Sequence, residues 1–263
     1  MRNGMENTYI GLETTFSLFM SYEVLARAYK KNNHPKDEVD LGFDGAHKSW
    51  FKAVPSMNYD NCGYTFALLN INAAIVEGVM RSILSQIVSD EKDRQVDIGI
   101  SEGRTKRTHP ENLLNRFHID IDSAGGWRKL KEQYERYLKL SITASSKPET
   151  KDAIETLFIL RNIFAHGTAL IHPKYELSED FKDEPIYNWQ SKLKGAAVYL
   201  KKHFKHDIIF DNLAEYSVPE HFLEKTKDFF NDILPVIGYS GERSKKTINA
   251  ILNYSFGFIA VYR

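Results

Sequence analysis

An arginine, an asparagine and a histidine lie close together at the end of a strongly apolar segment, in the run Arg161-Asn162-Ile163-Phe164-Ala165-His166. At about 100° per residue, Asn162 and His166 are about 40° apart on a helix and share a face. Arg161 is about 140° from His166, but its long side chain can reach round the helix. Polar groups beside an apolar element cost free energy unless they line a cleft or bond to another element. These three side chains are therefore the first candidate site.

The chemistry available to this trio is cleavage of a phosphodiester bond. Histidine exchanges protons near neutral pH. Arginine can hold phosphate oxygens and stabilise charge that develops at phosphorus. Asn162 could orient either His166 or the substrate. One histidine does not easily act as acid and base at once, so a two-fold dimer that brings two such clusters together would supply both groups.

The segment resembles the signature of HEPN domains, in which an arginine is followed four to six residues later by a histidine, often with a polar residue directly after the arginine. Here Arg161 and His166 are separated by four residues, Asn162 is the polar residue and Gly167 follows. HEPN domains are helical bundles, and an earlier helix often carries an acidic residue that faces the site. Glu77, in an apolar run, is the candidate for that residue.

Many HEPN proteins are metal-independent endoribonucleases that act as dimers in toxin–antitoxin, abortive-infection and other defence systems. The resemblance implies that Arg161 and His166 are catalytic and that Asn162 supports them. It further implies an RNA substrate, a homodimer, no cofactor or metal, and an antitoxin or other defence-system protein as a partner. One HEPN toxin pattern has a modifiable tyrosine two residues after the histidine; Thr168 stands there, which does not favour that control.

Simpler interpretations of the same residues stay open at this point. Arg161 and His166 could bond to carbonyl groups at the helix end and anchor a loop. Glu77 and Arg81 are four residues apart and could form a surface ion pair. Some HEPN domains bind nucleotides, RNA or protein partners without cutting. A non-catalytic binding module is therefore the alternative function.

A third functional hypothesis is a metal-dependent phosphoesterase. His118, Asp120 and Asp122 alternate, so on a short strand they would share a face and could ligate a metal. An extended, solvated loop is the competing interpretation of residues 118–122, and no other ligand is close in sequence. We therefore predict no metal site.

The 35 basic and 35 acidic residues give a net charge of zero, which argues against a protein that coats nucleic acid by bulk positive charge. Charge is nevertheless uneven along the chain. Residues 192–206 hold five lysines and no acid, with histidines and aromatic residues between them, and Lys201, Lys202 and Lys205 are the candidate RNA contacts. Arg104, Lys106 and Arg107 form a second basic spot.

Hydrophobic periodicity indicates a mainly α fold, a helical bundle with at most short strands. We predict a long central helix over 64–88, an exposed loop over 90–109 and a helix from Glu149 to His166. Ser146 is expected to cap that last helix and Gly167 to end it. Further helices are predicted over 189–204 and 219–237, the second broken at Pro235, with a brief strand at 208–210.

We expect three parts: an N-terminal helical elaboration (1–60), a HEPN-like core (61–170) and a C-terminal helical part (171–263) packed on the same domain. The most apolar window, residues 248–262, is shorter than the roughly 20 residues that a membrane-spanning helix needs. A single cysteine, Cys62, excludes an intrachain disulfide and is typical of a reducing compartment. A cytoplasmic protein without membrane association is the expectation.

Overall fold

The computed structural model describes residues 13–32, 59–123, 125–167, 170–178, 180–182, 188–239 and 244–258. The helices in chain order are α1 (Thr14–Asn32), α3 (Tyr59–Ser101), α4 (His109–Ser123), α5 (Trp127–Leu138), α6 (Pro148–Ala165), α7 (Trp189–Lys192), α8 (Lys194–Phe204), α9 (Ile209–Ala214), α10 (Val218–Ile237) and α11 (Lys245–Asn253). These ranges contain no strand, so the predicted mainly α helical bundle is confirmed.

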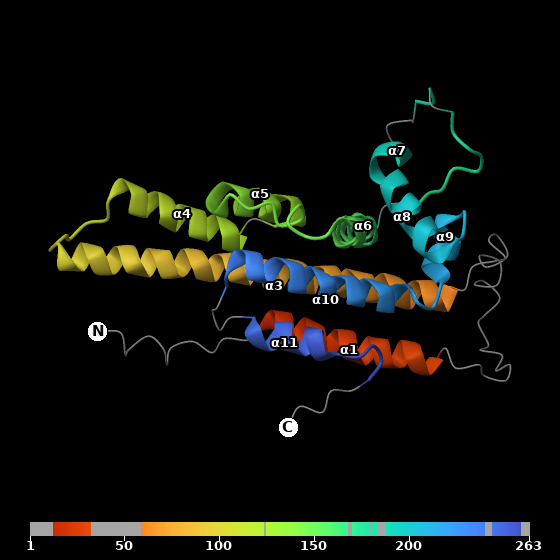
Figure 1. The fold of residues 1–263 in the computed structure, drawn as a ribbon, viewed down its shortest axis with the longest axis horizontal. Helices are drawn as coiled ribbons and strands as arrows, with labels where there is room; N and C mark the ends of the chain where they lie inside the picture. The colour runs from red at the N-terminus through yellow and green to blue at the C-terminus, as the bar shows by residue number, and fades with distance from the viewer. Residues whose placement is uncertain are drawn as a thin grey trace.

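Helix α3 is the spine of the bundle. Its 43 residues span about 65 Å at 1.5 Å per residue. Helices α1, α6 and α10 pack against its first part, and α4 lies along its second part (Figure 1). The first part is apolar on almost every face because it has neighbours on several sides. Its fully buried side chains include Leu68, Val76, Val79, Ile83 and Leu84.

The exposed loop predicted for residues 90–109 is wrong over most of its length, because α3 continues to Ser101. Charged residues are good helix formers, and Arg94 pairs with Glu91 one turn earlier at 2.8 Å. Glycine at position 99 does not end the helix, whereas Gly103 has a φ of 68° and does so just beyond it. The charges therefore mark a solvated helix face.

Residues 118–122 form neither a strand nor a loop, because they belong to α4. This helix begins with a capping box that we had not predicted. The Thr108 amide donates to Glu111 Oε2 at 2.6 Å, and the Glu111 amide donates to Thr108 Oγ1 at 3.4 Å. The cap starts a helix that then continues through the alternating stretch.

The capping box predicted at Ser146 is wrong. Ser146 Oγ instead donates backwards to the carbonyls of Ile142 and Thr143, at 3.3 and 3.2 Å. Helix α6 begins at Pro148, whose fixed φ suits the first helical position. Its end follows the prediction, since Gly167 has a φ of 59°.

The C-terminal part differs from prediction in three local features. Leu193 separates α7 from α8, where one helix was expected. The segment predicted as a strand, 208–210, begins the short helix α9 instead. Helix α10 runs through Pro235 to Ile237, and Gly238 caps it with a φ of 66°. The break predicted at Pro235 is therefore wrong.

One hydrophobic core extends through all three predicted parts of the chain, from Phe19 in α1 to Phe256 after α11. Helices α1 and α11 lie side by side (Figure 1). Thr247 of α11 donates to Glu13 at 2.6 Å, just before α1. By length and composition alone α3 could cross a membrane, but 56% of its most apolar window is buried inside the bundle. That burial is typical of a core helix.

Candidate functional site

Aromatic stacking holds the end of α6 against α3. The rings of Phe66 in α3 and Phe164 in α6 stack with centroids 4.0 Å apart. Six residues earlier on α6, Phe158 stacks on Trp127 of α5, with ring centroids 4.2 Å apart and ring planes at 2°. Such pairs contribute about 0.5–1.5 kcal/mol beyond burial of their area. The register of α6 on its neighbours is thereby fixed, and with it the direction of Arg161.

Glu77 lies at the centre of the candidate site. Its Oε1 accepts hydrogen bonds from Arg81 Nη2 at 2.9 Å and from the Gly126 amide at 3.1 Å. Its Oε2 accepts from Arg161 Nη2 at 3.4 Å. The Glu77 side chain is only 12% exposed. A carboxylate this buried needs compensation, and two guanidinium groups and one amide provide it.

Arg81 extends this network to α4. Its Nη1 donates to the Ile121 carbonyl in the last turn of that helix at 2.5 Å. Gly126, at the start of α5, has a φ of 91°, which favours glycine, and this conformation accompanies the hydrogen bond from its amide to Glu77. Glu77 thus connects α3, α4, α5 and α6.

Arg161 faces Glu77 with a side chain that is 26% exposed. Its Nη1 donates to Asn162 Oδ1 at 3.1 Å, and its Nη2 donates to Glu77. Two of its five N–H donors therefore have partners within the described residues. Asn162 itself is exposed and orients the guanidinium, so its contact is with Arg161 and not with His166.

His166 is exposed and forms the C-cap of α6. Among the described residues, its side chain has no hydrogen-bond or ion-pair partner. Neither His166 nor Arg161 donates from its side chain to a backbone carbonyl of the described residues. The simple carbonyl-anchoring interpretation therefore finds no support in this part of the chain. The structure brings Glu77, Arg161 and Asn162 into contact and places His166 one turn further along α6.

The surface ion pair suggested for Glu77 and Arg81 forms, but both side chains are largely buried, at 12% and 18% exposure. Arg81 and Gly126 were not predicted as members of the site. The spacing of four residues between Glu77 and Arg81 indicated their ion pair but not its burial at the site. Nothing in the sequence could have indicated Gly126, which is brought in by the path of the chain into α5.

The proposed metal trio does not share a face. On α4, His118 and Asp122 are four residues apart, and Asp120 points elsewhere, towards Gln133 at 3.0 Å. His118 instead lies between Ser85 and Lys92 of α3, at 3.1 Å from each. The described residues contain no group of three or more histidine, cysteine or acidic side chains that could hold a metal ion.

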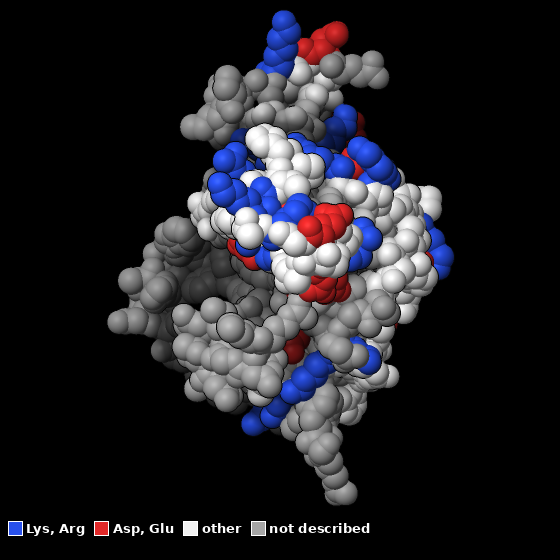
Figure 2. Space-filling model, turned by 90° about the vertical axis from the view of Figure 1, so that its left-hand side faces the viewer, with Lys and Arg blue, Asp and Glu red and all other residues white. Residues whose placement is uncertain are grey.

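The candidate lysines lie at the end of α8, where two of them are already engaged. Lys201 Nζ pairs with Asp207 at 2.6 Å, and Lys205 Nζ donates to the Lys202 carbonyl at 2.6 Å. All three lysines are exposed. At the opposite end of the molecule, Arg104 is paired with two glutamates at 2.7 and 2.8 Å. Figure 2 shows basic and acidic side chains intermingled at that end.

A histidine–tyrosine cluster near the start of α6 was not foreseen. Tyr199 of α8 and His221 of α10 are joined at 2.7 Å between the hydroxyl oxygen and Nε2. The His203 ring lies 4.8 Å from the His221 ring. Burial, with His203 and Lys225 nearby, lowers the pKa of His221 to about 4. The neutral form of His221 is therefore favoured, and its hydrogen bond with the Tyr199 hydroxyl joins α8 to α10.

Comparison of the chain with protein-family models, curated proteins and solved structures gives no match.

Proposed function

We propose that this protein is a metal-independent endoribonuclease of the HEPN type. The observation that carries the proposal is the contact between the buried Glu77 and Arg161, the first residue of the Arg–His motif. A carboxylate that fixes an arginine beside a histidine-bearing helix end matches the arrangement that the resemblance implies. Within the part of the chain that the structure describes, three of the five guanidinium donors of Arg161 have no partner and could contact a phosphate.

In the proposed reaction, His166 accepts the proton of a ribose 2′-hydroxyl, whose oxygen then attacks phosphorus. The 5′-oxygen leaves and takes a proton from His166 of a second subunit. Arg161 stabilises the negative charge on the pentacoordinate phosphorus. The products are a 2′,3′-cyclic phosphate and a 5′-hydroxyl end.

The homodimer is part of this proposal, because one histidine per site would leave either the attack or the departure without proton transfer. We further propose action in the cytoplasm, in a toxin or phage-defence setting, with an antitoxin or another defence-system protein as the regulating partner. The exposure of His166 supports access by a second subunit or by RNA.

The proposal is tested by incubating purified protein with cellular RNA in the presence of a chelator. We expect wild type to cleave and Arg161→Ala and His166→Ala to lose at least about 100-fold in rate. His206→Ala is the matched control. His206 is a partly exposed histidine that lies just after the end of α8 and pairs with Glu215. Equal rates for wild type and His166→Ala would remove the catalytic claim.

The alternative is a non-catalytic module that binds nucleotide, RNA or a protein partner through the same residues. It is favoured by one observation: no described residue holds the His166 ring in a fixed orientation. RNA binding without cleavage, lost in Arg161→Ala and kept in His166→Ala, would decide for this alternative.

A further inference from the structure

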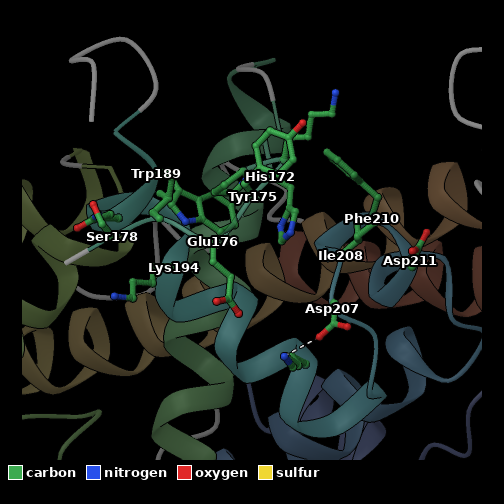
Figure 3. Close-up of a pocket in the computed structure, with 15 residues that line it drawn as sticks. His172, Tyr175, Glu176, Ser178, Trp189, Lys194, Asp207, Ile208, Phe210 and Asp211 are labelled. Atoms are coloured by element: carbon green, nitrogen blue, oxygen red, sulfur yellow. Dashed lines mark ion pairs between the residues drawn. The ribbon is translucent and has the colours of Figure 1, made fainter. Parts of the chain in front are cut away.

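A cavity of about 970 Å³ opens between residues 172–178 and helices α7, α8 and α9 (Figure 3). Its volume is at the upper end of the roughly 300–1,000 Å³ typical of small-molecule sites. None of the residues in the Glu77 network lines it. The cavity is therefore a separate feature of the molecule.

One side of the cavity is aromatic. Trp189 is 7% exposed and packs with Ile163 of α6 and with Leu193. The His172 ring stands edge-on to Trp189, with centroids 5.2 Å apart and planes at 85°. Tyr175 lies beside them and is 74% exposed, so its ring is available to a ligand (Figure 3). A fixed indole and an accessible phenol ring together suit a flat, aromatic ligand.

The other side of the cavity carries charges of both signs. Lys201 and Asp207 form an ion pair at 2.6 Å, and Glu176 points towards this pair (Figure 3). Lys194 is exposed at the cavity and has no partner among the described residues. Burial lowers the pKa of His172, which favours the uncharged ring.

Aromatic rings, carboxylates and lysines in one cavity match the three parts of a nucleotide. A base stacks on aromatic rings, carboxylates accept hydrogen bonds from base amino groups or ribose hydroxyls, and ammonium groups contact phosphate. A base that is paired inside a duplex cannot stack on the aromatic rings of this cavity, whereas an unpaired base can. We propose that this cavity binds one unstacked nucleotide of single-stranded RNA.

This nucleotide site rests on the proposed function, because the nucleotide would belong to an RNA strand that also reaches the Arg161–His166 end. Ile163, which packs with Trp189, is about 60° from His166 on α6, so cavity and helix end lie on neighbouring sides. His172 is six positions after His166 in the chain, which limits their Cα atoms to about 20 Å apart. A short strand could occupy both places.

The test measures equilibrium binding of a fluorescently labelled, fully 2′-O-methylated hexanucleotide to the intact protein, with the four nucleoside 5′-monophosphates as competitors. The 2′-O-methyl groups prevent cleavage, so binding is read independently of catalysis. We expect Tyr175→Ala and Lys194→Ala each to weaken binding roughly tenfold. Lys151→Ala is the control, since Lys151 is an exposed lysine of α6 outside the cavity, and it should bind within about twofold of wild type.

Both altered side chains are exposed, so these variants keep the fold, which circular dichroism checks. Trp189→Phe preserves an apolar ring and should remove the fluorescence quenching that bound nucleotide causes in wild type. Binding of the monophosphates without the oligonucleotide would overturn RNA as the source. Equal affinity of wild type and the two cavity variants would overturn the site. Intact binding with no cleavage of ordinary RNA would instead overturn the proposed function alone.

Discussion

Glu77 is the residue on which the candidate site depends most. Its two oxygens accept from Arg81, Arg161 and the Gly126 amide, so α3, α6 and the start of α5 meet at one carboxylate, and Arg81 connects it to α4. A largely buried charge that loses its partners is costly, and each arginine would lose its counter-ion if the carboxylate were neutralised. Glu77 therefore holds the Arg161 guanidinium in position and balances its charge.

Replacing Glu77 with glutamine tests that coupling. We expect Glu77→Gln to lower the free energy of unfolding by about 1–3 kcal/mol, because two guanidinium groups lose their negative partner while the side-chain shape is kept. Urea denaturation measures this loss. RNA cleavage should fall at least about tenfold at temperatures where the variant is folded.

Glu155→Gln is the matched control, because Glu155 pairs with Lys131 at 2.7 Å but is 34% exposed. It should cost no more than about 1 kcal/mol. If both variants lose equal stability and equal activity, Glu77 has no special role at the site.

His221 gives the protein a predicted sensitivity to acid. Its pKa falls from 6.5 unfolded to about 4 in the folded protein, because burial and the nearby His203 and Lys225 oppose its charge. The unfolded chain therefore binds the proton first as pH falls. The contribution of the neutral His221 to the free energy of unfolding is fully present above about pH 6.5. It is lost as the pH falls towards 4, and the loss reaches up to about 3 kcal/mol.

His221→Gln measures this contribution, because the glutamine amide can still form a hydrogen bond with the Tyr199 hydroxyl but does not titrate. Urea denaturation between pH 7 and 4 should show a shallower loss of stability for this variant than for wild type. His206→Gln, at a partly exposed histidine, serves for comparison. Parallel pH curves for wild type and His221→Gln would contradict the assignment.

At the scale of elements, α1 and α3 approach one another closely at Gly78. A Cβ added there would lie 2.6 Å from Thr15 Cγ2, which is too close for real atoms. We expect Gly78→Ala to destabilise the protein by about 1–3 kcal/mol, despite the better helix propensity of alanine. Thermal unfolding measures the change.

Gly63→Ala in the same helix is the matched control, because an added Cβ there meets nothing within 4 Å. It should be neutral or stabilising by up to about 1 kcal/mol. Adding Thr15→Ser to Gly78→Ala removes the clashing methyl group and should restore part of the loss. A Gly78→Ala variant as stable as Gly63→Ala would show that α1 does not pack as described.

The elements could be predicted where local signals and packing agree. Helix α6 has an apolar run, Pro148 at its start and Gly167 at its end, so its bounds follow from sequence. The prediction failed over residues 90–101 because charge was taken as a sign of a loop, although charged residues form stable helices. It failed at 118–122 because alternation over five residues cannot outweigh a helix already begun by the cap at Thr108.

The candidate site could be predicted in part. Arg161, Asn162 and His166 follow from one short motif, and Glu77 from the family resemblance. The hydrogen bond from Gly126 could not be predicted, because it depends on how α5 is placed after α4. The cavity beside Trp189 was also missed, since its lining comes from residues 172–178 and three separate helices whose packing no local pattern specifies.

At the scale of the whole molecule, basic and acidic segments alternate along the chain, and basic side chains also pair with acidic ones in the folded structure. Both contribute to the zero net charge. Arg104 is paired with Glu102 and Glu111, and Lys201 with Asp207, so the basic runs are partly neutralised in place. RNA binding should therefore depend on a few specific contacts. The affinity for RNA is expected to fall only modestly as the salt concentration rises. A plot of log affinity against log salt concentration should have the slope of about one to three phosphate contacts.

The proposed mechanism predicts a homodimer in solution. Light scattering after gel filtration should give twice the chain mass of 30.4 kDa at working concentrations. Mixing wild-type protein with an excess of His166→Ala protein should lower the wild-type activity, because a mixed dimer holds only one of the two histidines that the site needs. A protein that is fully active as a monomer would refute the two-subunit site.

The most direct test of the central claim is the chemistry of the RNA ends. A single oligonucleotide is incubated with wild type or His166→Ala in the presence of a chelator, and the products are analysed by mass spectrometry. We predict 2′,3′-cyclic phosphate and 5′-hydroxyl ends with wild type, no products with His166→Ala, and no cleavage when the 2′-hydroxyls are methylated. Cleavage by His166→Ala at the wild-type rate, or products with 5′-phosphate ends, would contradict it.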